Sequence, residues 1–151
     1  MRRPRGRGDS GATAVEFALV MVPLVALLFG IIQYGLYFWA FQGGNDIARS
    51  AARLAAVGDP ADCAQFKSDV KSQISGLIGD PSTASITRTL EDSDGVAGRT
   101  TGDNWKVTVE FHSIDLHFPF VPFINGGVVS ATGYARADYF VDPSNPPPDC
   151  S

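Results

Sequence analysis

The sequence predicts an α+β protein in which a long apolar helix leads into a small head made of a short helix and an antiparallel sheet. Three observations predict this fold class. The stretch Phe17–Phe41 holds no charged side chain. A helical period continues beyond it to residue 57, and the last third of the chain alternates apolar and polar residues as strands do. We therefore divide the 151 residues into segments 1–11, 12–57, 58–141 and 142–151.

Segment 1–11 is a basic leader, with Arg2, Arg3, Arg5 and Arg7 against the single carboxylate of Asp9. Short basic flanks of an apolar helix stay in the cytoplasm, so we expect a single-pass protein with its head outside. The whole chain has a net charge of -4, and without the leader eight Lys and Arg remain against fifteen Asp and Glu. This acidity excludes nucleic acid as a partner, because nucleic-acid binding needs a basic surface.

Segment 12–57 is predicted to form one helix of about 70 Å, which is longer than a bilayer is thick. Its first part is apolar all round and contains Pro23, which is tolerated where neighbours satisfy the freed carbonyl. Gly43 and Gly44 weaken the helix, but the period then resumes. The second half should pack on the head or on other subunits through its apolar face, formed by Ile47, Ala51, Leu54 and Ala55.

The head is predicted to begin with a short helix that has Asp59 as its N-cap and Pro60 as its first helical residue. Its apolar stripe is Cys63, Phe66, Val70, Ile74, Leu77 and Ile78. Strands are expected at Ser85–Leu90, where Arg88 interrupts the apolar face, at Trp105–His112 and at Val128–Val141. Four apolar side chains of the irregular segment between the last two strands should pack under the sheet, with an exposed patch as the alternative: Phe118, Phe120, Phe123 and Ile124.

The chain has two cysteines, Cys63 and Cys150, which flank the head. If the head lies outside the cytoplasm, a disulfide between them is favoured over two free thiols, and it would pin the Pro-rich tail. His112 and His117 have no cysteine or carboxylate cluster beside them, so we expect no metal site. We find no catalytic motif, and we expect neither an enzyme nor a cofactor.

Three interpretations of the first 41 residues compete. A cleaved signal peptide has a shorter apolar region, and an ordinary membrane anchor leaves Glu16 unexplained. In the third interpretation the chain is a type IV prepilin that is cut on the cytoplasmic side, after Gly11 and before the apolar stretch. The side chain of Glu16 then lies at the entrance of an otherwise uncharged helix.

The motif Gly11-Ala12-Thr13-Ala14-Val15-Glu16-Phe17, the apolar run with Pro23 and the segment Ala48–Arg53 resemble the TadE-like proteins. These are minor pilins or pseudopilins of the Flp, or tight-adherence, branch of type IV pili. The resemblance implies a pilin-like fold and a membrane prepilin peptidase that cuts between Gly11 and Ala12.

The resemblance also implies that Glu16, at mature position 5, and the adjacent Phe17 take part in subunit recognition. Phe17 stands where the major pilins of this branch usually have tyrosine, which favours a minor subunit. The implied partners are the prepilin peptidase, other Flp/Tad pilins and the inner-membrane assembly platform. The alternative is an uncleaved single-pass membrane protein with an extracytoplasmic binding domain.

Overall fold

The computed structural model describes residues 9–58, 62–76, 78–92, 95, 102–119, 121–138 and 148–151. Helix α1 spans Asp9–Ala56, and helix α2 spans Cys63–Ser72. Strands β1 (Asp80–Glu91), β2 (Asn104–His112) and β3 (Val128–Arg136) form an antiparallel sheet in the order β1-β2-β3. A short 3₁₀ helix, η1 (Ile124–Gly127), precedes β3. The predicted α+β fold class is confirmed.

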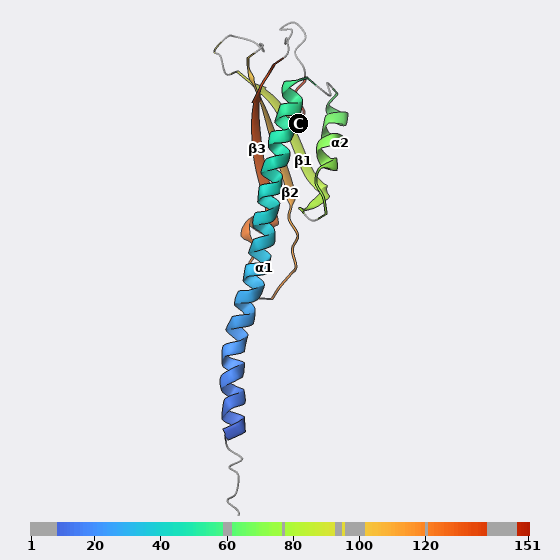
Figure 1. The fold of residues 1–151 in the computed structure, drawn as a ribbon. Helices are drawn as coiled ribbons and strands as arrows, with labels where there is room; N and C mark the ends of the chain where they lie inside the picture. Colours follow the sequence, from blue (N-terminus) through green and yellow to red (C-terminus); the bar gives the residue numbers. More distant parts are fainter. Residues whose placement is uncertain are drawn as a thin grey trace, which may run out of the picture.

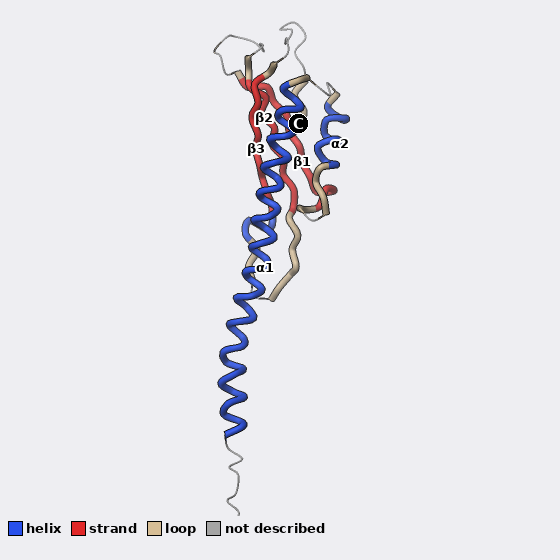
Figure 2. The backbone as a smooth tube through the Cα atoms, in the orientation of Figure 1, coloured by secondary structure: helices blue, strands red, loops and turns tan. Residues whose placement is uncertain are grey.

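The molecule is a long rod with a head at one end (Figure 1). The C-terminal half of α1 lies along the sheet, whereas its N-terminal half projects beyond it (Figures 1 and 2). α1 is continuous through Pro23 and through the two glycines that the sequence suggested would weaken it. Gly44 instead permits close packing, because a Cβ there would lie 3.1 Å from the ring of Phe111.

One face of the sheet carries the core. In β2 the buried residues alternate with exposed or half-buried ones, as the sequence predicts. Helix α1 packs on β2 and β3, and α2 packs on β1. Small side chains of α1 let the helix lie close to β3, where a Cβ on Gly133 would stand 2.3 Å from the carbonyl oxygen of Ala48. The core residues at this interface are Ala48, Ala51, Ala52, Ala55, Val107, Val109, Val129 and Ala131.

The opposite face of the sheet is polar. Thr108 and Thr132 face each other across β2 and β3 with their hydroxyl oxygens 3.2 Å apart. Lys106 donates a hydrogen bond of 2.9 Å to Glu91, and this bond raises the pKa of Lys106. Neither helix of the described chain covers this face (Figure 1).

Three predicted boundaries are wrong: both ends of the short helix and the end of the last strand. The cap of the short helix is Asp62, whose carboxylate accepts a 3.1 Å bond from the Gln65 amide, whereas the predicted cap at Asp59 and Pro60 lies outside the described residues. The helix ends at Ser72, so Ile74 and Ile78 contribute to the core from the following turns. The last strand ends at Arg136, five residues before its predicted end, in a region where residues 139–141 are not described.

Arg88 occupies a position that its chemistry did not suggest. It is 2% exposed and lies on the core face of β1. Its guanidinium carbon is 4.6 Å from the ring centre of Phe66 and 5.1 Å from that of Trp105. The planar cation thus fills the space between α2 and the sheet by stacking on two aromatic rings.

Candidate membrane-anchoring and assembly segment

The N-terminal half of α1 is the most apolar exposed surface of the described chain. Within Gly11–Ala56 lies an apolar window long enough to cross a membrane, and none of that window is buried inside the protein. A surface of this size needs a bilayer or other helices to cover it. Its large exposed side chains include Val15, Phe17, Leu19, Val20, Val22, Leu24, Leu27, Leu28 and Ile31.

The residues predicted to guide processing and recognition lie at the free end of this helix. Gly11 and Ala12 belong to its first turn, and a Cβ on Gly11 would meet nothing within 4 Å. Glu16 is exposed one turn after Ala12, on the same face of the helix. Among the residues that the structure describes, Glu16 has no ion-pair partner.

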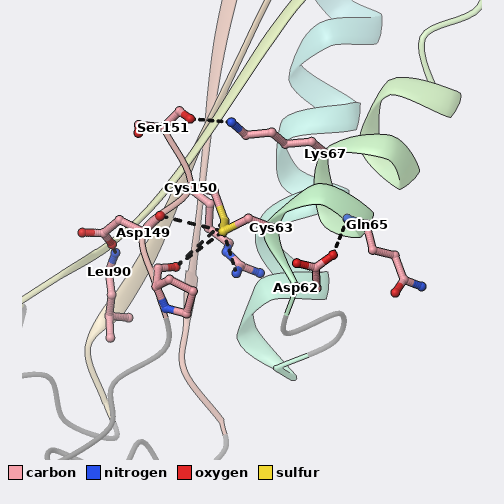
Figure 3. Close-up of a disulfide and its surroundings, with 10 residues drawn as sticks. Asp62, Cys63, Gln65, Lys67, Leu90, Asp149, Cys150 and Ser151 are labelled. Atoms are coloured by element: carbon pink, nitrogen blue, oxygen red, sulfur yellow. Dashed lines mark hydrogen bonds between the residues drawn. A yellow bond between two sulfur atoms is a disulfide. The ribbon is translucent and has the colours of Figure 1, made fainter.

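The two cysteines lie at the other end of the molecule. Cys63, the first residue of α2, is joined to Cys150 in a disulfide (Figure 3). The tail pairs with β1 through two 2.8 Å backbone bonds between Arg88 and Cys150. Leu90 adds a 3.2 Å amide bond to the Asp149 carboxylate. The disulfide therefore fastens the short segment around Cys150 to the edge of the sheet. Cys150 lies 87 residues after Cys63 in the chain.

A connection between the head and the apolar helix escaped sequence analysis. Gln33 is 1% exposed, and its side-chain amide donates a 3.0 Å bond to the carbonyl of Ile114. Its side-chain oxygen accepts a 3.1 Å bond from the amide of Leu116. The sequence did contain one signal for this connection, because Gln33 is the most polar residue of the uncharged run. It could not reveal the partners of Gln33, which lie more than 80 residues away in the chain.

Aromatic residues extend this connection in both directions along α1. The rings of Phe29 and Phe118 stack with centres 4.4 Å apart, and Tyr37 meets Phe123 edge to face at 6.1 Å. The prediction that the phenylalanine cluster packs under the sheet is wrong for its described members. Phe118 and Phe123 are half-buried against α1, Ile124 is 41% exposed, and Phe120 lies outside the described residues.

We expect Gln33→Leu to lower the free energy of unfolding by about 1–3 kcal/mol, because it leaves two backbone groups of the loop without their partners. Thermal unfolding in detergent micelles measures the change. Gln42→Leu is the matched control, since Gln42 is exposed on the same helix and should change stability by less than about 0.5 kcal/mol. Equal effects of the two variants would contradict the role given to Gln33.

A folded α+β head carried on one long apolar helix fits the class of membrane-anchored proteins. Comparison with known proteins narrows the class: residues 11–53 match the family model described as TadE-like protein. The resemblance found in the sequence is thereby confirmed over the apolar part of α1 and its continuation into the head.

No curated protein and no solved structure matches the chain. Among the described residues, no group of three or more His, Cys, Asp and Glu side chains could hold a metal ion.

Proposed function

We propose that the chain is a prepilin that is cut between Gly11 and Ala12 and then joins the assembly of a Flp/Tad-type pilus as a minor subunit. One observation carries this proposal: beyond Ala12, the exposed apolar half of α1 holds a single carboxylate, Glu16, one turn further on. A simple anchor has no use for a charge there, since an unpaired carboxylate in an apolar environment is costly. The family match over residues 11–53 supports the same function.

Processing requires the first turn of α1 to open. Gly11 is helical in the structure, whereas a peptidase binds its substrate in an extended conformation. Glycine makes this change easy, because it destabilises a helix by about 1 kcal/mol relative to alanine. The position also has open space around it. Cleavage would remove the basic leader and leave a new ammonium group on Ala12.

Glu16 would then pair with the Ala12 ammonium of a neighbouring subunit. Two opposite charges about 4 Å apart attract by roughly 4 kcal/mol at an effective dielectric of 20, before the cost of desolvation. Burial of the apolar side chains around Phe17 would supply most of the association energy. The charge pair chiefly fixes the register, because a shifted helix would leave a carboxylate buried alone.

The remaining partners follow from the same proposal. Before assembly the protein would lie in the cytoplasmic membrane with its basic N-terminus inside and its head outside, where a disulfide is stable. There it would meet the prepilin peptidase, other Flp/Tad pilins and the inner-membrane assembly platform. The large head on the helix favours a minor subunit, in which the head remains available for contacts beyond the shaft.

N-terminal sequencing of protein purified from its native host tests the proposal, with wild type, Glu16→Ala and Glu16→Gln compared. We expect all three to begin at Ala12. We expect the amount of protein recovered in sheared pili to fall at least tenfold for Glu16→Ala and for its isosteric control Glu16→Gln. A tenfold fall corresponds to a loss of about 1.4 kcal/mol in the free energy of association.

Recovery of Met1 or Arg2 as the first residue would exclude processing and favour the uncleaved single-pass alternative. Correct processing with unchanged pilus recovery in both variants would instead remove the recognition role of Glu16. The two parts of the proposal therefore fail separately.

A further inference from the structure

The described residues of the segment between β2 and η1, 113–119 and 121–123, are hereafter called the descending loop, which extends along α1 well below the sheet (Figures 1 and 2). Its described tip contacts the apolar half of the helix. Phe118 stacks on Phe29 at 4.4 Å. Pro119 forms one wall of a groove of about 420 Å³ whose other walls are apolar side chains of α1: Ala18, Met21, Val22, Val25, Ala26 and Phe29.

The length of a membrane span places this contact inside the bilayer. An α-helix needs about 20 residues to cross the hydrocarbon core. Counted from Ala12, that span ends near Ile31, and counted from Phe17, it ends near Leu36. Phe29 falls inside the span in both cases, and the groove lies deeper still.

The hydrogen bonds of the descending loop fit such a position. Irregular backbone is tolerated at membrane depth only where its polar groups are satisfied by protein. Gln33 satisfies the carbonyl of Ile114 and the amide of Leu116, and the Tyr34 hydroxyl donates a 2.9 Å bond to the carbonyl of Pro122. These donors and acceptors all come from α1, the helix that carries the candidate membrane span.

We propose that the descending loop is seated in the leaflet on the head's side of the membrane, where lipid acyl chains cover Phe118, Pro119 and the groove. Asp115 and His117, whose carboxylate oxygen and ring nitrogen Nε2 are 3.6 Å apart, are exposed just before the tip and would lie among the headgroups. They limit how far the loop enters. The head would thus be held against the membrane at two points instead of swinging on a single helix.

The groove is assigned to lipid because it is continuous with the apolar surface that faces the bilayer. Its walls are almost entirely apolar, with no charged residue among them. This inference needs α1 to cross a membrane, but it does not need cleavage at Gly11 or assembly into a pilus. Its failure is therefore distinguishable from failure of the proposed function.

Depth-dependent fluorescence quenching tests the proposal on the full chain, reconstituted at one copy per phosphatidylcholine nanodisc. The native cysteines are joined, so one added cysteine can be labelled with nitrobenzoxadiazole without reductant. We compare Leu116→Cys on the loop with Val22→Cys in the helix and Val57→Cys on the head. Leu116 and Val57 are both exposed apolar residues. Val57 follows α1 about 40 Å beyond Phe29 along its axis.

We expect lipids spin-labelled on their acyl chains to quench the Leu116→Cys and Val22→Cys probes at least twofold more than the Val57→Cys probe. Pro119→Cys gives a second loop position if the first variant does not fold. The proposal would be overturned if lipid quenched both loop probes no more strongly than it quenches the Val57→Cys probe. It would also be overturned by a Val22→Cys probe that lipid does not quench, or by loop quenching that needs several copies per disc, since a second helix would then cover the groove.

Discussion

Replacing both cysteines with serine should lower the free energy of unfolding of the head by about 4–5 kcal/mol. Cys63 and Cys150 are separated by 87 residues, and closing so long a loop removes much conformational entropy from the unfolded chain. This loss is comparable to the entire stability of many small domains. Urea unfolding of the Cys63→Ser/Cys150→Ser variant, compared with wild type, measures the change.

The structure also predicts which part of the head will lose stability. The tail bonds to β1 through the amide of Arg88, 2.8 Å from the Cys150 carbonyl, and through the amide of Leu90, 3.2 Å from Asp149. Without the disulfide these two amides should exchange hydrogen faster than those between β2 and β3. An edge strand freed in this way also becomes a site for aggregation.

Lys67→Ala is the control for the disulfide variant. It removes only the bond from the Lys67 ammonium to the carbonyl of Ser151, which is exposed (Figure 3), and should change stability by less than about 1 kcal/mol. A double-serine variant that loses no more stability than Lys67→Ala, with Arg88 and Leu90 still protected, would contradict the fastening role of the disulfide.

Gly133→Val should prevent α1 from docking on the sheet. The first atom of any side chain at this position would lie 2.3 Å from the carbonyl oxygen of Ala48 and 2.8 Å from the amide nitrogen of Arg49. Both atoms belong to helix backbone, which cannot rotate away as a side chain could. Overpacking typically costs about 1–3 kcal/mol, and we expect about 3 kcal/mol or more here because whole elements must separate.

Thermal unfolding of Gly133→Val, Gly133→Ala and Gly76→Ala measures this effect. Gly133→Ala should be destabilised as well, since the close contact begins at Cβ. Gly76→Ala is the matched control, because a Cβ there meets nothing within 4 Å and the change should be neutral or slightly stabilising. Similar melting temperatures for the two alanine variants would show that α1 and β3 can move apart at little cost.

Sequence analysis predicted those parts of the structure that local patterns specify. The uncharged run and the helical period after it predicted α1 almost to its last residue. Alternation predicted the buried side of β2. The cap of α2 was misplaced because Asp59 and Asp62 give the same local signal, and only the fold determines which carboxylate meets a free amide.

The residues of the candidate site also divide into those that a local pattern reveals and those that it does not. Glu16 stands out in the sequence because it is the one charge beside a long apolar run. Gln33 and Arg88 do not, because each owes its place to groups distant in the chain: the descending loop for Gln33, and the rings of Phe66 and Trp105 for Arg88.

The sequence by itself determined that this protein has an apolar helix with one carboxylate near its end and a small mixed head, because hydrophobic periodicity acts over neighbouring residues. Only the tertiary structure decided that the descending loop contacts α1 at Phe29 and that the tail completes the edge of β1. Those contacts join segments far apart in the chain, and their energy comes from packing and hydrogen bonds that no local pattern encodes.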